Sequence, residues 1–194
     1  MKTDIILAGV GGQGILSIAT IIGIAAVNNE IYLKQAEVHG MSQRGGDVQS
    51  HLRLSDKPIA SDLIAKGKAD LIIALEPMEA LRYVDMLSKD GWIVTNSKSF
   101  VNIDNYPDID EVYKGIKKIK NHILIDADQI AKDLGSVRSA NMVILGAAMS
   151  LIDIDKSEFE KAISERFKSK GEKIVNTNIE ALNAGEKAAK EYKL

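Results

Sequence analysis

The sequence contains no cysteine among its 194 residues. The chain therefore cannot form a disulfide, bind an iron–sulfur cluster through thiolates of its own, or use a thiolate as a nucleophile. Its formal net charge is only −2, so it has no basic field to attract nucleic acid. The longest apolar run, residues 15–27, is shorter than the roughly 20 residues that span a bilayer, and we expect no membrane partner. No signal-peptide pattern precedes the first strand, which favours a cytoplasmic location.

The length and the hydrophobic fraction of 45% predict one domain, residues 1–194, with a sizeable core. Strand and helix patterns alternate along the chain, and a turn at Pro58 predicts that residues 59–64 return as the hairpin partner of 48–54. The predicted strands are 4–8, 31–38, 48–54, 69–75, 92–95 and 123–125, and the predicted helices are 15–27, 77–87, 108–118, 141–152, 157–168 and 174–192. The predicted fold class is α/β, a three-layer α/β/α, Rossmann-like domain with a mostly parallel sheet and an antiparallel hairpin.

The predicted helix 15–27 carries no charged residue on any face. A surface helix normally has a polar side, so this helix is expected to be covered on both sides. Two coverings remain open at this point: the chain's own C-terminal helices, or a partner subunit.

A glycine-rich turn, Gly9-Val10-Gly11-Gly12-Gln13-Gly14, joins the first strand to this helix and matches G-x-G-x-x-G. Such a turn can present backbone N–H groups and a helix N-terminus to a phosphate. A dinucleotide site also needs an acid near the end of the second strand, where this chain has Lys34 and only later Glu37. Three interpretations therefore stay open: NAD or FAD, another phosphate-bearing or nucleotide ligand, or a turn used for packing and interface contacts.

A second polar cluster, Glu37 to Gly46, follows the second predicted strand. Its three glycines allow a tight fold, and its Arg44 suits a phosphate, a carboxylate or an acidic residue of a partner. His51 and Arg53, on the polar face of the next strand, are expected to extend the same patch. The alternative is a solvated loop with incidental charges.

The sequence shows no catalytic set of residues. It has no G-x-S-x-G elbow, no H-E-x-x-H and no complete P-loop lysine pattern. Asp126 and Asp128 could bind a metal but are interpreted as helix-capping and first-turn charges, and capping is also the first interpretation of residues 136–141.

Together these segments resemble the gamma domain of the 2-oxoacid:ferredoxin oxidoreductases, and within that family the indolepyruvate enzymes. The resemblance rests on the glycine turn, on residues 37–46, on His51-x-Arg53, and on residues 70–77 and 141–147, so it covers most of the chain.

The resemblance implies an accessory role in a hetero-oligomeric enzyme. The complete enzyme would decarboxylate aryl pyruvates oxidatively, form an acyl-CoA from the co-substrate CoA, and reduce ferredoxin. The large alpha subunit is expected to carry thiamine diphosphate, its divalent metal and the iron–sulfur clusters, so that this chain bears no cofactor and no catalytic residue and is inactive alone. The alternatives are a stand-alone NAD- or FAD-binding Rossmann-type protein and a scaffold without a ligand.

The glycine turn and the Arg44 loop both follow strand ends, so they are expected to meet at one edge of the sheet. There they would form an anion-accepting corner for a CoA phosphate or an acidic segment of the alpha subunit. The predicted ligand- or partner-binding residues are Gly9, Gly11, Gly12, Gln13, Gly14, His39, Ser42, Gln43, Arg44, Gly45, Gly46, His51 and Arg53.

Overall fold

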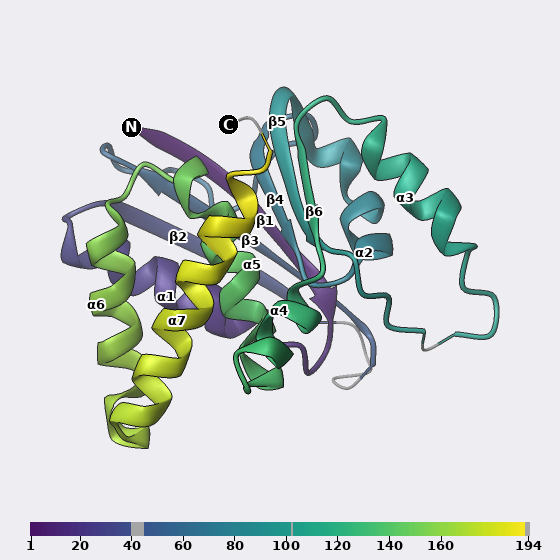
Figure 1. The fold of residues 1–194 in the computed structure, drawn as a ribbon. Coiled ribbons are helices and arrows are strands. Elements are labelled where there is room, and N and C mark those ends of the chain that lie inside the picture. Colours follow the sequence, from purple (N-terminus) through teal and green to yellow (C-terminus); the bar gives the residue numbers. More distant parts are fainter. Residues whose placement is uncertain (40–44, 102, 193–194) are drawn as a thin grey trace.

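The computed structural model describes residues 1–39, 45–101 and 103–192, without the side chain of His39. A six-stranded sheet in the order β2-β3-β1-β4-β5-β6 forms its centre (Figure 1). The strands are β1 (Lys2–Val10), β2 (Tyr32–His39), β3 (Asp47–Ser55), β4 (Ala69–Ala74), β5 (Leu87–Asn96) and β6 (His122–Ile125). The helices are α1 (Ile15–Asn28), α2 (Pro77–Arg82), α3 (Ile109–Lys117), α4 (Ala127–Asp133), α5 (Ala140–Ala148), α6 (Lys156–Phe167) and α7 (Glu172–Ala189).

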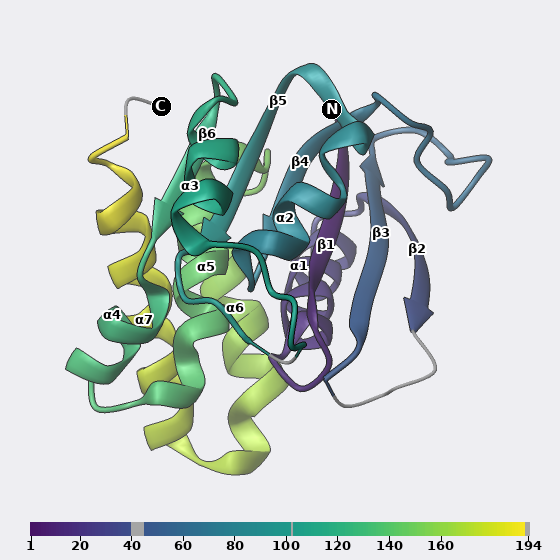
Figure 2. The same ribbon diagram turned by 90° about the vertical axis from the view of Figure 1, so that its right-hand side faces the viewer.

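The two faces of the sheet are covered differently. Helices α1, α4, α5, α6 and α7 cover one face, and α2 and α3 cover the other (Figures 1 and 2). Apolar residues alternate between the faces, as on β1, where Ile5 and Leu7 join the larger core and Ile6 and Ala8 the smaller one. The three-layer α/β/α prediction is confirmed. Within the described residues, no helix is both long and apolar enough to cross a membrane.

The sheet is mostly parallel, with one strand running against the others. β1, β4, β5 and β6 pair in parallel, whereas β3 runs antiparallel to both β1 and β2. The predicted hairpin of residues 48–54 with 59–64 is wrong: the antiparallel neighbours of β3 are β1 and β2, and residues 59–64 form no strand. Both edges of β3 are occupied, for example by Ile5 and Gln35 opposite Leu52. The fully described segment 56–68, which contains Pro58, therefore runs as a loop over the sheet.

Several predicted boundaries move. The helix predicted for 77–87 ends at Arg82, and Leu87 already belongs to β5, after a short 3₁₀ turn at Val84–Met86. The structure also forms α4, which the apolar pattern did not predict because the helix is only one to two turns long.

The charge-free helix α1 is covered mainly by the chain itself. Its buried side packs on the sheet and joins α5 and α6 in the larger core, where Ile18, Ile21 and Ile22 are fully buried. Leu16 and Val27 nevertheless remain 45% and 62% exposed. The first of the two expected coverings thus accounts for most of the helix and leaves an apolar stripe open.

Two glycines allow α5 and α7 to cross closely. A Cβ atom added at Gly146 would lie 1.9 Å from the carbonyl oxygen of Leu182, and one added at Gly185 would lie 1.9 Å from that of Val143. Because both obstacles are backbone atoms, neither can move without separating the helices. The close contact between α5 and α7 therefore requires glycine at both positions.

We expect Gly146→Ala and Gly185→Ala each to lower the free energy of unfolding by about 2 kcal/mol or more, because overpacking forces the two helices apart. Gly23→Ala is the matched control. A Cβ at Gly23 meets only the end of the Leu33 side chain at 3.3 Å, so the higher helix propensity of alanine should leave stability unchanged or raised by up to about 1 kcal/mol. Urea unfolding of the full chain measures all three variants, and equal effects at the three sites would contradict this account.

Candidate functional site

The glycine turn lies between the end of β1 and the start of α1, at the carboxyl edge of the parallel strands. Gly12 and Gly14 have φ angles of +103° and +93°, which side chains rarely tolerate. A Cβ at Gly14 would also meet the Asn141 amide nitrogen at 2.5 Å. α1 has no acidic residue in its first turn and no side-chain cap, so its N-terminal donors are left to other acceptors.

The side chain of Gln13 braces this turn from inside. Its Oε1 accepts a hydrogen bond from the Val10 backbone N–H at 2.8 Å, and its Nε2 donates to the Leu75 carbonyl oxygen at 3.2 Å. One amide thus ties the end of β1 to the residue that follows β4. This explains a glutamine that the dinucleotide pattern does not require.

A cavity of about 470 Å³ opens beside the turn, on the face of the sheet that carries α1 and α5. The Asn96 side chain, from the end of β5, donates to Asp128 Oδ2 at 2.6 Å and accepts from the Ala127 backbone N–H at 3.0 Å. Arg138 is exposed at this cavity, and no ion pair is recorded for it among the described residues. The cavity is lined by Gly12, Gln13, Gly14, Ser17, Leu75, Asn96, Asp128, Val137, Arg138, Ala140 and Asn141.

The cavity contains residues that the sequence pattern did not select. The interpretation as helix-capping and first-turn charges is confirmed: Asp126 caps α4 by accepting from the Gln129 backbone N–H, and Asp128 lies in the first turn of that helix, where it also accepts from Asn96. Arg138 and Asn141 line the cavity, and neither caps α5 through its side chain. The only available signal was that these residues follow predicted strands or precede an apolar helix, which does not say which side chains face inward.

A second, mainly apolar cavity of about 410 Å³ lies on the other side of the same turn, between Leu16 and Val48. Here the two predicted loops meet. The Gly11 N–H donates to the Gly46 carbonyl oxygen at 2.8 Å, and the Gly45 N–H donates to that of Gly11 at 3.4 Å. The end of the second cluster therefore lies against the glycine turn. Ser42, Gln43 and Arg44, with Gly40 and Met41, and the side chain of His39 lie outside the described residues.

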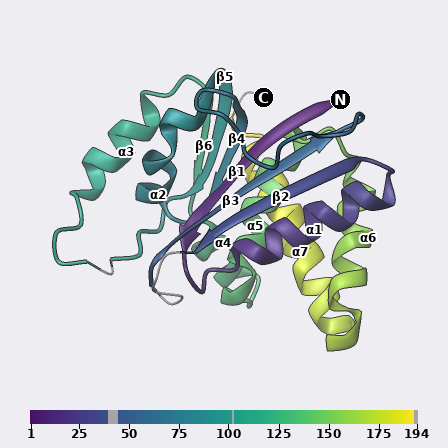
Figure 3. The same cartoon turned by 180° about the vertical axis from the view of Figure 1, so that it is seen from behind.

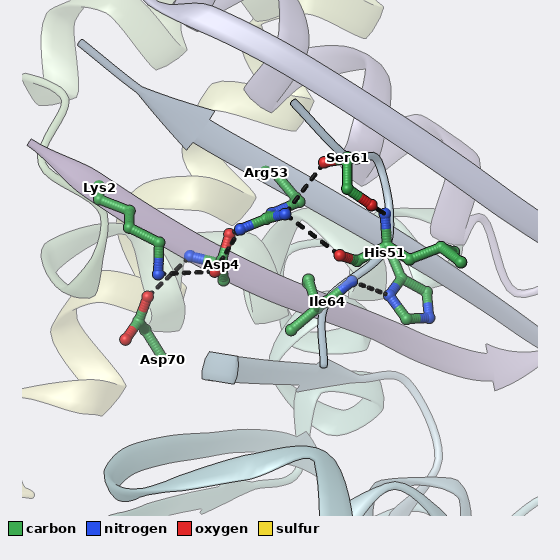
Figure 4. A network of polar contacts seen from close by, with 8 residues as sticks. Lys2, Asp4, His51, Arg53, Ser61, Ile64 and Asp70 are labelled. Carbon is green, nitrogen blue, oxygen red and sulfur yellow. Dashed lines mark hydrogen bonds and ion pairs between the residues drawn. The ribbon is translucent and has the colours of Figure 1, made fainter. Parts of the chain in front are cut away.

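His51 and Arg53 do not extend this corner. Arg53 forms a bidentate pair with the buried Asp4 at 2.7 and 3.1 Å and also donates to the carbonyl oxygens of Ser61 and Leu63 (Figure 4). Burial alone would raise the pKa of Asp4, but the hydrogen bonds from Arg53 and Lys2 hold it below its ordinary value. The guanidinium is therefore committed to the structure.

The His51 ring has a similar structural role. Its Nδ1 accepts from the Ile64 backbone N–H at 2.9 Å, so this nitrogen carries no proton (Figure 4). Burial lowers the pKa of His51 and favours the same neutral form. The expected extension of the patch fails because both side chains fasten the 56–68 loop to the sheet face opposite α1.

A buried group of acids lies next to the junction of the two loops. Tyr83 donates to Asp47 Oδ2 at 2.6 Å, while Glu79 pairs with Arg82 at 2.7 Å. The other Asp47 oxygen, Oδ1, is buried and has no hydrogen-bond partner in the part of the chain that the structure describes. Burial raises the pKa of Glu79, and the nearby Asp47 carboxyl raises it further against the opposing effect of Arg82. The raised pKa favours the protonated form of Glu79.

These features define a Rossmann-like α/β domain with a polar corner at the carboxyl edge of its sheet. The strand order departs from a dinucleotide-binding unit, because β3 lies between β1 and β2. The end of β2, where an acid would hold the ribose, is therefore not beside the glycine turn.

The family described as pyruvate ferredoxin/flavodoxin oxidoreductase matches residues 4–188, and the chain belongs to it. Indolepyruvate oxidoreductase subunit IorB from Archaeoglobus fulgidus is 37% identical over 194 residues, covering 95% of this chain and 94% of that protein. The expected family is thereby confirmed, and the chain is a subunit of this kind of oxidoreductase.

Solved structures of the same family share the fold. The 2-oxoglutarate:ferredoxin oxidoreductase from Magnetococcus marinus, solved with 2-oxoglutarate, coenzyme A and succinyl-CoA bound, matches with a TM-score of 0.78 and 25% identity. The match covers 99% of this chain but only 32% of that one, so this chain spans about a third of its length. The keto/oxoacid ferredoxin oxidoreductase gamma subunit from Geobacter sulfurreducens matches with a TM-score of 0.70 and 26% identity, over 97% of this chain and 99% of that one. Relatives named as subunits support a hetero-oligomer.

We expect Gln13→Ala to lower the free energy of unfolding by about 1–3 kcal/mol, because it leaves the Val10 N–H without its acceptor and removes one of the two amide donors to the Leu75 carbonyl oxygen. Gln129→Ala removes an exposed amide bonded to Asp133 and should change stability by less than about 0.5 kcal/mol. Urea unfolding of both variants measures the difference. A Gln13→Ala variant as stable as the control would show that the brace contributes nothing.

We expect Glu79→Gln to flatten the fall in stability that follows a rise in pH. The folded-state pKa of Glu79 is raised, so its contribution is complete below the unfolded value of 4.5 and is lost as pH increases through the folded value. The loss amounts to about 1.4 kcal/mol per unit of pKa difference. Thermal unfolding from pH 4 to 8 measures it, and parallel profiles for the two proteins would contradict the raised pKa of Glu79. Glu158, whose pKa Lys161 lowers, is the control with the opposite sign: its contribution is lost as pH falls.

Proposed function

We propose that this chain is the cofactor-free subunit of an indolepyruvate:ferredoxin oxidoreductase and supports CoA-dependent oxidative decarboxylation of aryl pyruvates. The observation that carries the substrate class is the 37% identity to an IorB subunit over nearly the full length of both proteins. The second candidate substrate class is a dicarboxylic 2-oxo acid, supported by the structural match to a 2-oxoglutarate enzyme at 25% identity. A cytoplasmic location stays a prediction of the N-terminal sequence.

The division of labour with a large alpha subunit is supported by the chemistry of this chain. It has no cysteine to bind an iron–sulfur cluster. Among the described residues, no three His, Cys, Asp or Glu side chains are grouped so as to hold a metal ion. These residues do not fit thiamine diphosphate with its divalent metal, and they do not fit an iron–sulfur cluster. We therefore propose that the partner subunit carries these groups and transfers the electrons to ferredoxin.

The corner at the glycine turn suits the anionic part of CoA. Backbone N–H groups at the start of α1 and the exposed Arg138 guanidinium can donate hydrogen bonds to a phosphate. The Asn96 and Asn141 amides line the same cavity. The predicted contribution of Arg44 stays a proposal; the described end of its loop, Gly45 and Gly46, is hydrogen-bonded to Gly11. The same donors would suit an acidic segment of the alpha subunit, and the experiment below separates these two ligands.

We expect Arg138→Ala and Arg44→Ala, each co-expressed with the large subunit, to raise the KM for CoA about tenfold or more while leaving the KM for the 2-oxo acid unchanged. A lost charge-assisted hydrogen bond of about 1.5–3 kcal/mol corresponds to such a factor. Initial rates with indolepyruvate, phenylpyruvate and 2-oxoglutarate measure it and identify the substrate. Arg166→Ala, in α6, is the matched control.

Size-exclusion chromatography of the same complexes tests the second ligand. An unchanged KM combined with loss of the large subunit from the complex would assign the corner to subunit contact. If neither the KM nor assembly changes, the anion-accepting corner is refuted. Reduction of NAD or a flavin by the chain alone would refute the subunit assignment itself.

A further inference from the structure

β2 is the open edge of the sheet. At the opposite edge, β6 has only four residues, and Tyr192 from the C-terminal segment donates to its Leu124 carbonyl oxygen. β2 has eight residues, pairs with β3 in an unbroken register from Tyr32 to His39, and contains no proline. Among the described residues, no further strand pairs with its outer side, and β2 is the last strand of the sheet in Figure 2. Such a long, regular edge presents unpaired backbone groups to another strand.

Apolar side chains flank this edge on both faces of the sheet. Tyr32 and Val38 are 50% and 54% exposed and lie on the same face, because they are an even number of residues apart. On the other face lies the exposed Val27 of α1, a helix that runs beside β2 (Figure 3). A groove of about 330 Å³ lies between them, lined by Ala19, Thr20, Gly23, Ile24, Val27, Asn28, Leu33, Gln35 and Glu165. Exposed apolar side chains thus lie next to the strand on both faces of the sheet.

The sequence of β2 is complementary to itself in one antiparallel register. A two-fold axis between antiparallel strands keeps each side chain on its own face, so the axis must pass through a residue and not between residues. With the axis at Gln35, Tyr32 of each copy lies opposite Val38 of the other, an aromatic and β-branched pair of the kind that stabilises sheets. Lys34 then faces Ala36, and Glu37 faces Leu33, so no like charges are directly opposite.

We propose that β2 pairs with β2 of a second copy of this chain about an axis at Gln35, which joins two sheets into one and brings the two α1 helices together. Gln35 then lies directly opposite its own copy; within the chain its Nε2 donates to Glu37 Oε1 and Ser50 Oγ at 3.2 Å each. An axis at Ala36 would instead place Lys34 opposite Val38 and leave Tyr32 without Val38 as its directly opposite partner. Because the strand is complementary to itself, we assign this edge to a second copy rather than to the large subunit. This assignment does not depend on the identity of the substrate.

The absence of native cysteine makes a direct test possible, because an introduced thiol is unique in the chain. Directly opposite Cα atoms in an antiparallel pair are about 4.5–5.5 Å apart, within the range of a disulfide. We expect Gln35→Cys alone to give a disulfide-linked dimer on mild oxidation. Val38→Cys alone should stay monomeric on a non-reducing gel, and the double variant Tyr32→Cys/Val38→Cys should cross-link. Leu63→Cys, which is 57% exposed on the 56–68 loop, is the matched control and should not cross-link.

The experiment is performed on the full chain alone and on its complex with the large subunit. The double variant Tyr32→Lys/Val38→Lys should lower the dimer fraction of the isolated chain at least tenfold in analytical ultracentrifugation. Cross-linking of Ala36→Cys in place of Gln35→Cys would overturn the proposed register. A Gln35→Cys variant that stays monomeric in both preparations, or whose thiol becomes protected only on binding the large subunit, would overturn the pairing of two copies. None of these outcomes alters the CoA measurements, so the two proposals fail independently.

Discussion

The carboxyl edge of this domain depends on one side-chain amide. Gln13 lies inside the glycine turn and hydrogen-bonds to the backbone of Val10 and Leu75. These residues lie at the carboxyl ends of the neighbouring parallel strands β1 and β4. Asn96 continues the arrangement at the next strand by binding Asp128 and the Ala127 N–H at the start of α4. The floor of the cavity is therefore a row of amides that hydrogen-bond to the backbone and to one carboxylate. Such a floor is rigid, and it leaves the outer N–H groups of the turn and the Arg138 guanidinium to act on a ligand.

The antiparallel strand β3 decides what the glycine turn can do. Placed between β1 and β2, it occupies the side of β1 where a dinucleotide fold would place its second strand. It also brings Gly45 and Gly46 against Gly11. The same topology that argues against NAD or FAD thus creates the corner proposed for CoA or an acidic segment.

The face of β3 opposite α1 has a structural role that uses most of its charged groups. Arg53 with Asp4, and His51 with Ile64, fasten the 56–68 loop, while Asp47 with Tyr83 joins the start of the strand to the region of α2. Where no helix covers the sheet, polar side chains bonded to loop carbonyl and N–H groups take over the covering. Exposed apolar residues lie at the edge of β2, on the stripe of α1 and at the cavity beside the glycine turn, where Val137 is exposed. Exposed apolar surfaces of this kind are suited to subunit contacts in a multi-subunit enzyme of this family.

Local pattern determined most of the secondary structure, because it depends on hydrophobic period and turn residues that neighbours along the chain supply. The strand at 69–75, the helix at 15–27 and the alternation of Val48, Leu52 and Leu54 against Gln49, His51 and Arg53 were all predictable on that basis. The glycine-rich turn and the family were also visible in the sequence. Tertiary structure alone decided that β3 separates β1 from β2, that Arg53 pairs with Asp4, and that Gln13, Asn96 and Arg138 share one cavity edge. These features depend on contacts between segments that are distant in sequence. The local pattern of residues predicts a strand but does not determine which other strand pairs with it.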